Sequence, residues 1–117
     1  MIILENLIKK VTNGGTNYNY IYRLVKSQIY VLMYGELTMV QAYGIEIETQ
    51  DMIEGSVVHI ERDCVENISP QRYKVKNLFK TCYDNTVSPI HMIDILGEYI
   101  DEYTSDFDDT LKDIANC

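Results

Sequence analysis

The sequence of 117 residues lacks tryptophan and holds only two prolines, two histidines and three cysteines. Nowhere does it contain the ~20 consecutive apolar residues of a membrane span, and lysines follow rather than precede its first apolar stretch. The cysteines, Cys64, Cys82 and Cys117, are odd in number and show no CxxC spacing. This pattern excludes a secreted disulfide framework and a zinc ribbon. We therefore expect a cytoplasmic protein with reduced thiols and no signal peptide.

The remaining composition is that of one soluble globular domain, with 46% apolar and 24% charged residues. A chain of this length can bury a single core without help from a disulfide or a metal ion. We expect one domain over residues 1–117, with no metal and no cofactor.

Basic residues are almost missing from the C-terminal third of the chain. Residues 84–117 contain nine acids and one base, Lys112, and so carry the whole formal charge of −8. Such a field repels nucleic acids and attracts positively charged surfaces, including those with which other proteins hold nucleic acid. The pattern predicts a basic, nucleic-acid-binding protein as partner, with no direct binding to nucleic acid or membrane.

Signatures of catalysis and metal binding are weak. His59 with Cys64, or His91 with Cys82, would form a nucleophilic dyad only if the fold brought them together, which the sequence leaves open. The spacing of these four residues fits no usual zinc cluster. The aspartates within 106–109 resemble the start of a calcium loop but lack its glycine and closing glutamate. We expect a protein that is not an enzyme.

Alternating apolar residues predict an antiparallel meander of three or four strands over residues 18–66. The strand expected over residues 37–49 places Tyr43, Ile45 and Ile47 in the core and Glu46 and Glu48 in water. Turns are expected at Gly35-Glu36 and over residues 50–55. Residues 1–12 fit a short helix ending at Gly14-Gly15, with a strand as the alternative.

Two Ser-Pro pairs predict where helices begin, because serine caps a helix and proline suits its first position. They are Ser69-Pro70 and Ser88-Pro89, which open helices over residues 70–84 and 89–103. Residues 104–117 form either a third short helix or a frayed acidic tail. The predicted class is α+β, an antiparallel three- or four-stranded meander with two to three C-terminal helices packed on one face. The second helix should turn these residues to the core: Ile90, Ile93, Leu96, Ile100 and Tyr103.

The opposite side of that second helix carries four acids at three- and four-residue spacing, which stack along one helix face. They are Asp94, Glu98, Asp101 and Glu102, called the acidic ridge below. Because folding does not require four acids on one face, we predict that the acidic ridge binds the partner.

Tyrosine is the one enriched aromatic, with ten residues against two phenylalanines. Tyr18, Tyr20 and Tyr22 gather near the first hairpin, where tyrosine suits an interface. On a sheet, however, packing between neighbouring strands is the favoured explanation. We name them as second partner-binding candidates and expect at least one to face solvent.

Three short motifs resemble a small uncharacterised domain family of Firmicutes over residues 18–102: Tyr22-Arg-Leu-Val, Tyr43-Gly-Ile-Glu-Ile and Val87-Ser-Pro-Ile-His-Met-Ile-Asp-Ile-Leu. In size, acidity and tyrosine content the chain is also similar to anti-CRISPR proteins of phages and plasmids from those bacteria. That similarity implies a non-enzymatic inhibitor that occupies the basic surface of a type II CRISPR nuclease. A chromosomal regulatory or adaptor domain is the alternative, and the oligomeric state stays open.

Overall fold

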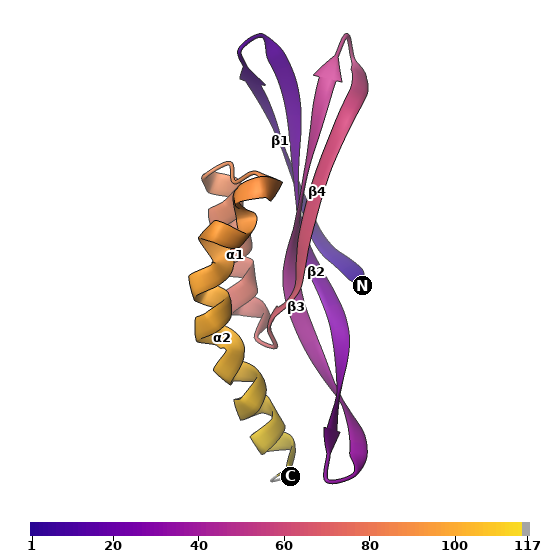
Figure 1. Ribbon diagram of the computed structural model, residues 1–117, viewed down its shortest axis with the longest axis vertical. Helices are drawn as coiled ribbons and strands as arrows, with labels where there is room; N and C mark the ends of the chain where they lie inside the picture. Colours follow the sequence, from indigo (N-terminus) through magenta and orange to yellow (C-terminus); the bar gives the residue numbers. More distant parts are fainter. Residues whose placement is uncertain (116–117) are drawn as a thin grey trace.

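The computed structural model describes residues 1–115 and consists of four long antiparallel strands followed by two α-helices (Figure 1). The strands form one sheet in the order β1-β2-β3-β4, so each pairs with its neighbour in sequence. The molecule is elongated, 57 × 22 × 19 Å. The predicted α+β class and the meander are confirmed. The strands are β1 (Ile2–Asn13), β2 (Thr16–Met33), β3 (Glu36–Ile53) and β4 (Ser56–Ser69).

The N-terminal segment is strand β1, so the expectation of a helix is wrong and the alternative is correct. It pairs antiparallel with β2, with Leu7 opposite Tyr22. Its isoleucines and valine suit a strand, and it pairs with β2 from Ile2 to Asn13, with one irregularity between Ile3 and Glu5. A short helix would be marginal by itself, so the tertiary pairing decides.

All three hairpins close in two residues with positive φ, the backbone geometry of type I′ turns. The turn pairs are Gly14-Gly15, Tyr34-Gly35 and Glu54-Gly55. The turn expected over residues 50–55 is therefore too long, because β3 continues through Ile53. The sheet therefore consists of long antiparallel strands joined by two-residue turns.

The helices are α1 (Arg72–Asp84), the short 3₁₀ helix η1 (Pro89–His91) and α2 (Met92–Ala115). Helix α1 begins two residues later than predicted, and the Ser69 hydroxyl oxygen accepts a hydrogen bond of 3.0 Å from the Gln71 N–H. Pro89 occupies the first position of η1, as expected. Residues 104–115 continue α2 instead of forming a third helix or a frayed end, while residues 116–117 lie outside the described part of the chain.

Both helices cover the same face of the sheet, as predicted (Figure 1). Ile45 and Ile47 of β3 lie in one cluster with Phe79 of α1 and Leu96 of α2. Tyr43 is half-buried beside this cluster rather than within it. One core therefore joins the sheet and the helices.

The predicted core stripe of α2 is wrong at its beginning, since Ile90 is 70% and Ile93 52% exposed. Met92, which is not part of the predicted stripe, is buried together with Leu96. The α-helix starts at Met92, after η1, so the core row runs at four-residue spacing from Met92. Ile93 lies about 100° around the helix from that row.

The middle hairpin extends beyond both neighbouring strands. Lys26 is the last residue of β2 that pairs with β1. Tyr43 is the first residue of β3 that pairs with β4. Residues 27–42 of β2 and β3 therefore form a two-stranded ribbon, called the β2–β3 ribbon below, with no other strand of residues 1–115 on either side (Figure 1).

Candidate partner-binding surface

All four carboxylates of the acidic ridge are exposed on α2. None of them pairs with a basic side chain within residues 1–115. Each negative charge is therefore available to an outside cation. The helix holds them in a row, since its core side is fixed by Met92 and Leu96.

A fifth acid of α2, Asp106, has a structural role instead. Its carboxylate accepts hydrogen bonds of 2.9 Å from the Ser69 hydroxyl and from the Lys74 ammonium. The hydrogen bond to Asp106 raises the pKa of Lys74, whose ammonium also lies 4.9 Å from the centre of the Tyr103 ring. These contacts tie α2 to α1 and to the end of β4. Asp106 is thus paired within the fold, whereas the four acids of the acidic ridge are not.

The tyrosine row of β2 mainly packs the fold. Tyr22 is fully buried, and its hydroxyl donates a hydrogen bond of 2.9 Å to the Val87 carbonyl oxygen. Burial, with a smaller contribution from Tyr20, raises the pKa of the Tyr22 hydroxyl well above its ordinary value. Tyr22 is therefore wrong as a partner-binding candidate. Tyr18 and Tyr20 are half-buried rather than free, and their ring centres lie 6.4 Å apart in an edge-to-face arrangement.

The row continues from the sheet onto α1. The rings of Tyr22 and Tyr83 meet edge to face at 5.7 Å. The Lys9 ammonium lies 4.4 Å from the centre of the Tyr83 ring and donates hydrogen bonds to the Tyr83 carbonyl oxygen and the Thr86 hydroxyl. The cross-strand and sheet-to-helix packing explains the tyrosine enrichment near β2.

Four charged residues form a cluster that the sequence did not predict. They lie on the side of the sheet that points away from the helices. Glu46 and Glu48, predicted to face water, are only 7% and 2% exposed. Arg23 lies 2.6 Å from Glu46, and Arg62 donates two hydrogen bonds to Glu48. Burial alone would raise the pKa of Glu48, but hydrogen bonds from Arg62, Gln50 and Arg23 outweigh it and lower the pKa.

The reason for this burial is that arginines of both neighbouring strands lie over the two glutamates. Arg23 stands opposite Glu46 in the β2 register, and Arg62 opposite Glu48 in the β4 register. Opposite charges at facing positions of adjacent strands were the signal available in the sequence. The cluster is internally satisfied, and we assign it a structural role.

The thiols and histidines do not form the dyads considered above. Cys82 is buried in the core, and burial raises its pKa to about 11. Burial and the nearby carboxylate of Glu46 raise the pKa of Cys64 to about 11 as well. His59 lies 3.4 Å from Glu61 at an exposed site of β4. Both thiols are held in the protonated form at neutral pH, which disfavours nucleophilic chemistry.

Within residues 1–115, no three His, Cys, Asp or Glu side chains lie close enough together to hold a metal ion. In the same part of the chain, neither helix combines the length and apolarity of a bilayer span.

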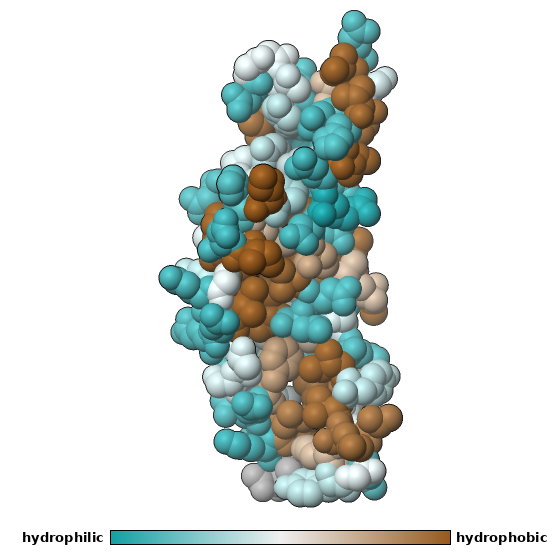
Figure 2. All heavy atoms as spheres, in the orientation of Figure 1, coloured by the Kyte–Doolittle hydropathy of each residue, from teal (hydrophilic) through white to brown (hydrophobic). Residues whose placement is uncertain are grey.

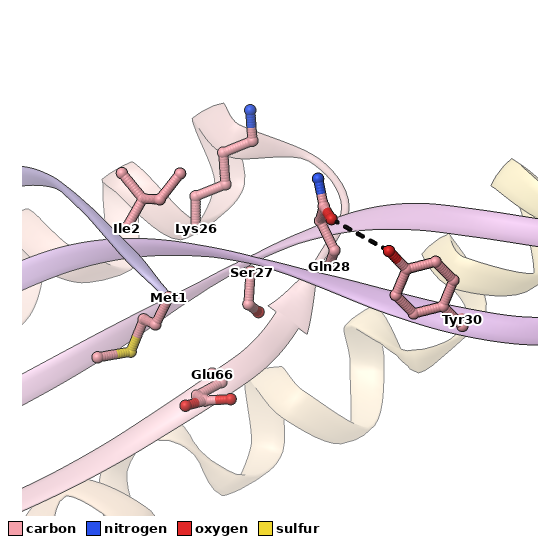
Figure 3. A pocket seen from close by; sticks show the side chains of 7 residues that line it. All are labelled: Met1, Ile2, Lys26, Ser27, Gln28, Tyr30 and Glu66. Carbon is pink, nitrogen blue, oxygen red and sulfur yellow. Dashed lines mark hydrogen bonds between the residues drawn. The ribbon is translucent and has the colours of Figure 1, made fainter.

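A hollow of about 460 Å³ lies at the root of the β2–β3 ribbon (Figure 3). Lys26 and Gln28 point to the side of β2 opposite Glu66, so the polar groups do not converge on one point. A ligand site needs convergent polar groups, and this hollow lacks them. Its lining residues are Met1, Ile2, Lys26, Ser27, Gln28, Tyr30 and Glu66.

Residues 1–102 match the model of the family described as a family of unknown function, DUF6514. The chain belongs to the DUF6514 family. No curated protein and no solved structure matches it. The DUF6514 match begins at β1, earlier than the resemblance over residues 18–102, and includes the whole acidic ridge. The last part of α2, from residue 103, lies outside the match.

Proposed function

We propose that this protein binds another protein by docking the acidic ridge onto a basic surface of the kind that holds nucleic acid. The observation that carries the proposal is the row of four exposed, unpaired carboxylates on one helix. Like charges at three- and four-residue spacing repel one another, so this spacing does not itself stabilise the helix. The acidic ridge does attract a basic surface and speeds association with it.

A type II RNA-guided nuclease is one partner of this chemistry, because its guide and target lie in a positively charged channel. Docking there makes the protein an inhibitor that competes with nucleic acid, in the manner of an anti-CRISPR protein from a phage or other mobile element. The supporting feature is the acidity of α2. The alternative is a regulatory or adaptor domain whose acidic helix only maintains solubility.

The test compares the wild-type protein with Glu98→Lys/Glu102→Lys. Pull-down from a lysate of the native host, at low and high salt, identifies basic partners, and a purified type II nuclease with and without guide RNA is the defined probe. We expect the variant to bind at least about tenfold more weakly, because attraction becomes repulsion. We also expect heparin or RNA to compete with the wild-type protein.

Asp108→Lys/Asp109→Lys is the matched control, since both aspartates are exposed on α2 and the change in net charge is the same. If the acidic ridge is the contact, the control keeps most of the affinity. Equal loss in both double variants would show that only net charge matters. A folded Glu98→Lys/Glu102→Lys variant with unchanged affinity and salt dependence would reject the proposal.

A further inference from the structure

The β2–β3 ribbon has one open apolar face. Tyr30 lies opposite Met39 and Leu32 opposite Leu37, so these four side chains share one face of the ribbon. Their exposed fractions are 64%, 43%, 70% and 73%, and Tyr34 at the turn is 90% exposed. On the other face Val40 is buried and Ile29 half-buried. Figure 2 shows hydrophobic side chains gathered at this end of the molecule.

The area of the open face is at the upper end of the range for a monomer. At roughly 150–200 Å² for a large side chain, these exposed fractions leave roughly 500–700 Å² of side-chain surface open. The largest apolar patch of a typical monomer is about 300–600 Å². A standard protein interface buries about 800 Å² on each partner. Two such faces packed together supply most of an interface.

The ribbon also lacks charge that would select a charged partner. Residues 27–42 contain a single charged residue, Glu36, in a chain of net charge −8. A basic partner is drawn to the acidic ridge instead, and an anionic lipid surface repels the chain. An uncharged apolar surface is therefore best covered by another uncharged apolar surface.

We propose that the open face of the β2–β3 ribbon binds the same face of a second copy, making a twofold symmetric dimer. Leu32 and Leu37 form the centre of the contact. The tyrosine rings of Tyr30 and Tyr34 flank that centre, with their hydroxyls at the wet rim, the arrangement typical of interfaces. At the root of the ribbon the Tyr30 hydroxyl already donates a hydrogen bond of 3.5 Å to Gln28 (Figure 3). In a twofold symmetric dimer both copies use the same surface patch, so this single face is sufficient.

This dimer has a salt dependence opposite to that of docking by the acidic ridge. Each copy carries −8, so the two copies repel one another and salt screens that repulsion. Dimerisation should therefore tighten between about 50 mM and about 500 mM salt. Binding of a basic partner weakens over the same range.

The experiment is sedimentation velocity or light scattering of the full chain across a concentration series at both salt concentrations. We expect a species of twice the 13.6 kDa chain mass, favoured by salt. Leu32→Glu/Leu37→Glu places four carboxylates in the contact and should make the protein monomeric, with an unchanged far-UV circular dichroism spectrum. Val58→Glu/Ile60→Glu adds the same charge at exposed apolar sites of β4 and should leave the dimer intact.

A wild-type monomer at every concentration and salt, or equal dissociation of both variants, overturns the inference. Association only with vesicles of uncharged phosphatidylcholine overturns it in favour of a lipid surface. The proposed function is tested separately, because monomeric Leu32→Glu/Leu37→Glu keeps the acidic ridge and should still bind the basic partner.

Discussion

Gly44 of β3 lies so close to the Val65 carbonyl oxygen of β4 that a Cβ at Gly44 would be only 2.0 Å from that oxygen. The register between the two strands shifts at this point, between Tyr43 and Ile45, where β4 bulges. Gly44→Ala should therefore lower the free energy of unfolding by about 3 kcal/mol, because backbone cannot move aside as a flexible side chain does. Urea denaturation measures the change.

Gly97 provides the control, since it lies in α2 and a Cβ there would meet no atom within 4 Å. Gly97→Ala should raise the free energy of unfolding by about 0.5–1 kcal/mol, because alanine is the better helix former. Equal midpoints for both variants would contradict the close approach at Gly44.

Leu96 and Ile93 test the core row of α2. Leu96 is 1% exposed, and Leu96→Ala should cost about 2–5 kcal/mol by leaving a cavity. Ile93 is 52% exposed, and Ile93→Ala should change the stability by less than about 1 kcal/mol. Thermal unfolding of both variants distinguishes this row from the one that the sequence predicted, for which both substitutions would be costly.

The Tyr22 hydroxyl should stabilise the fold through its buried hydrogen bond to Val87. Tyr22→Phe keeps the ring and removes only the donor, and we expect a cost of about 1–2 kcal/mol. Tyr18→Phe is the control, because the Tyr18 hydroxyl makes no hydrogen bond within the described residues. Chemical denaturation should show no change for Tyr18→Phe, and a similar cost for both would assign the effect to something other than this bond.

Glu48 should make the free energy of unfolding depend on pH in the acidic range. Its pKa is lower in the folded protein than in the unfolded chain, so its ionised form favours folding at neutral pH. That contribution is complete above the pKa of the unfolded chain and is lost as the pH falls below it, through the lower pKa of the folded protein. Tm measured from pH 7 to pH 2 should fall across this range.

Glu48→Gln is expected to lower Tm at pH 7 and to flatten the acid limb of the profile. The amide cannot carry the negative charge that Arg62 and Arg23 bind. Wild-type and variant curves that stay parallel down to pH 2 would rule out Glu48 as the source of the acid sensitivity.

Much of the sheet was predictable because period-two alternation directly records which side of a strand is buried. Ile45 and Ile47 were placed correctly in the core, and the turn at Gly14-Gly15 follows from residues that accept positive φ. The exposure of the acidic ridge was also predictable, since its spacing fixes one helix face and carboxylates without partners stay in water.

The predictions that were wrong concern residues whose surroundings are set by other segments of the chain. Glu46 and Glu48 alternate as wet positions do, yet Arg23 and Arg62 from neighbouring strands bury them. Residues 1–12 have apolar spacing that fits a helix. They form a strand instead, because their backbone pairs with the edge of β2.

The sequence by itself determined the α+β class, the hairpin meander and an acidic helix, because these follow from local periodicity, turn residues and charge. The tertiary structure alone decided that Tyr22 is core and that Ile93 is surface. It also decided that the β2–β3 ribbon extends past its neighbours with one apolar face open. These features depend on where other strands and helices end, and a side chain's burial is set by what packs against it from elsewhere in the chain.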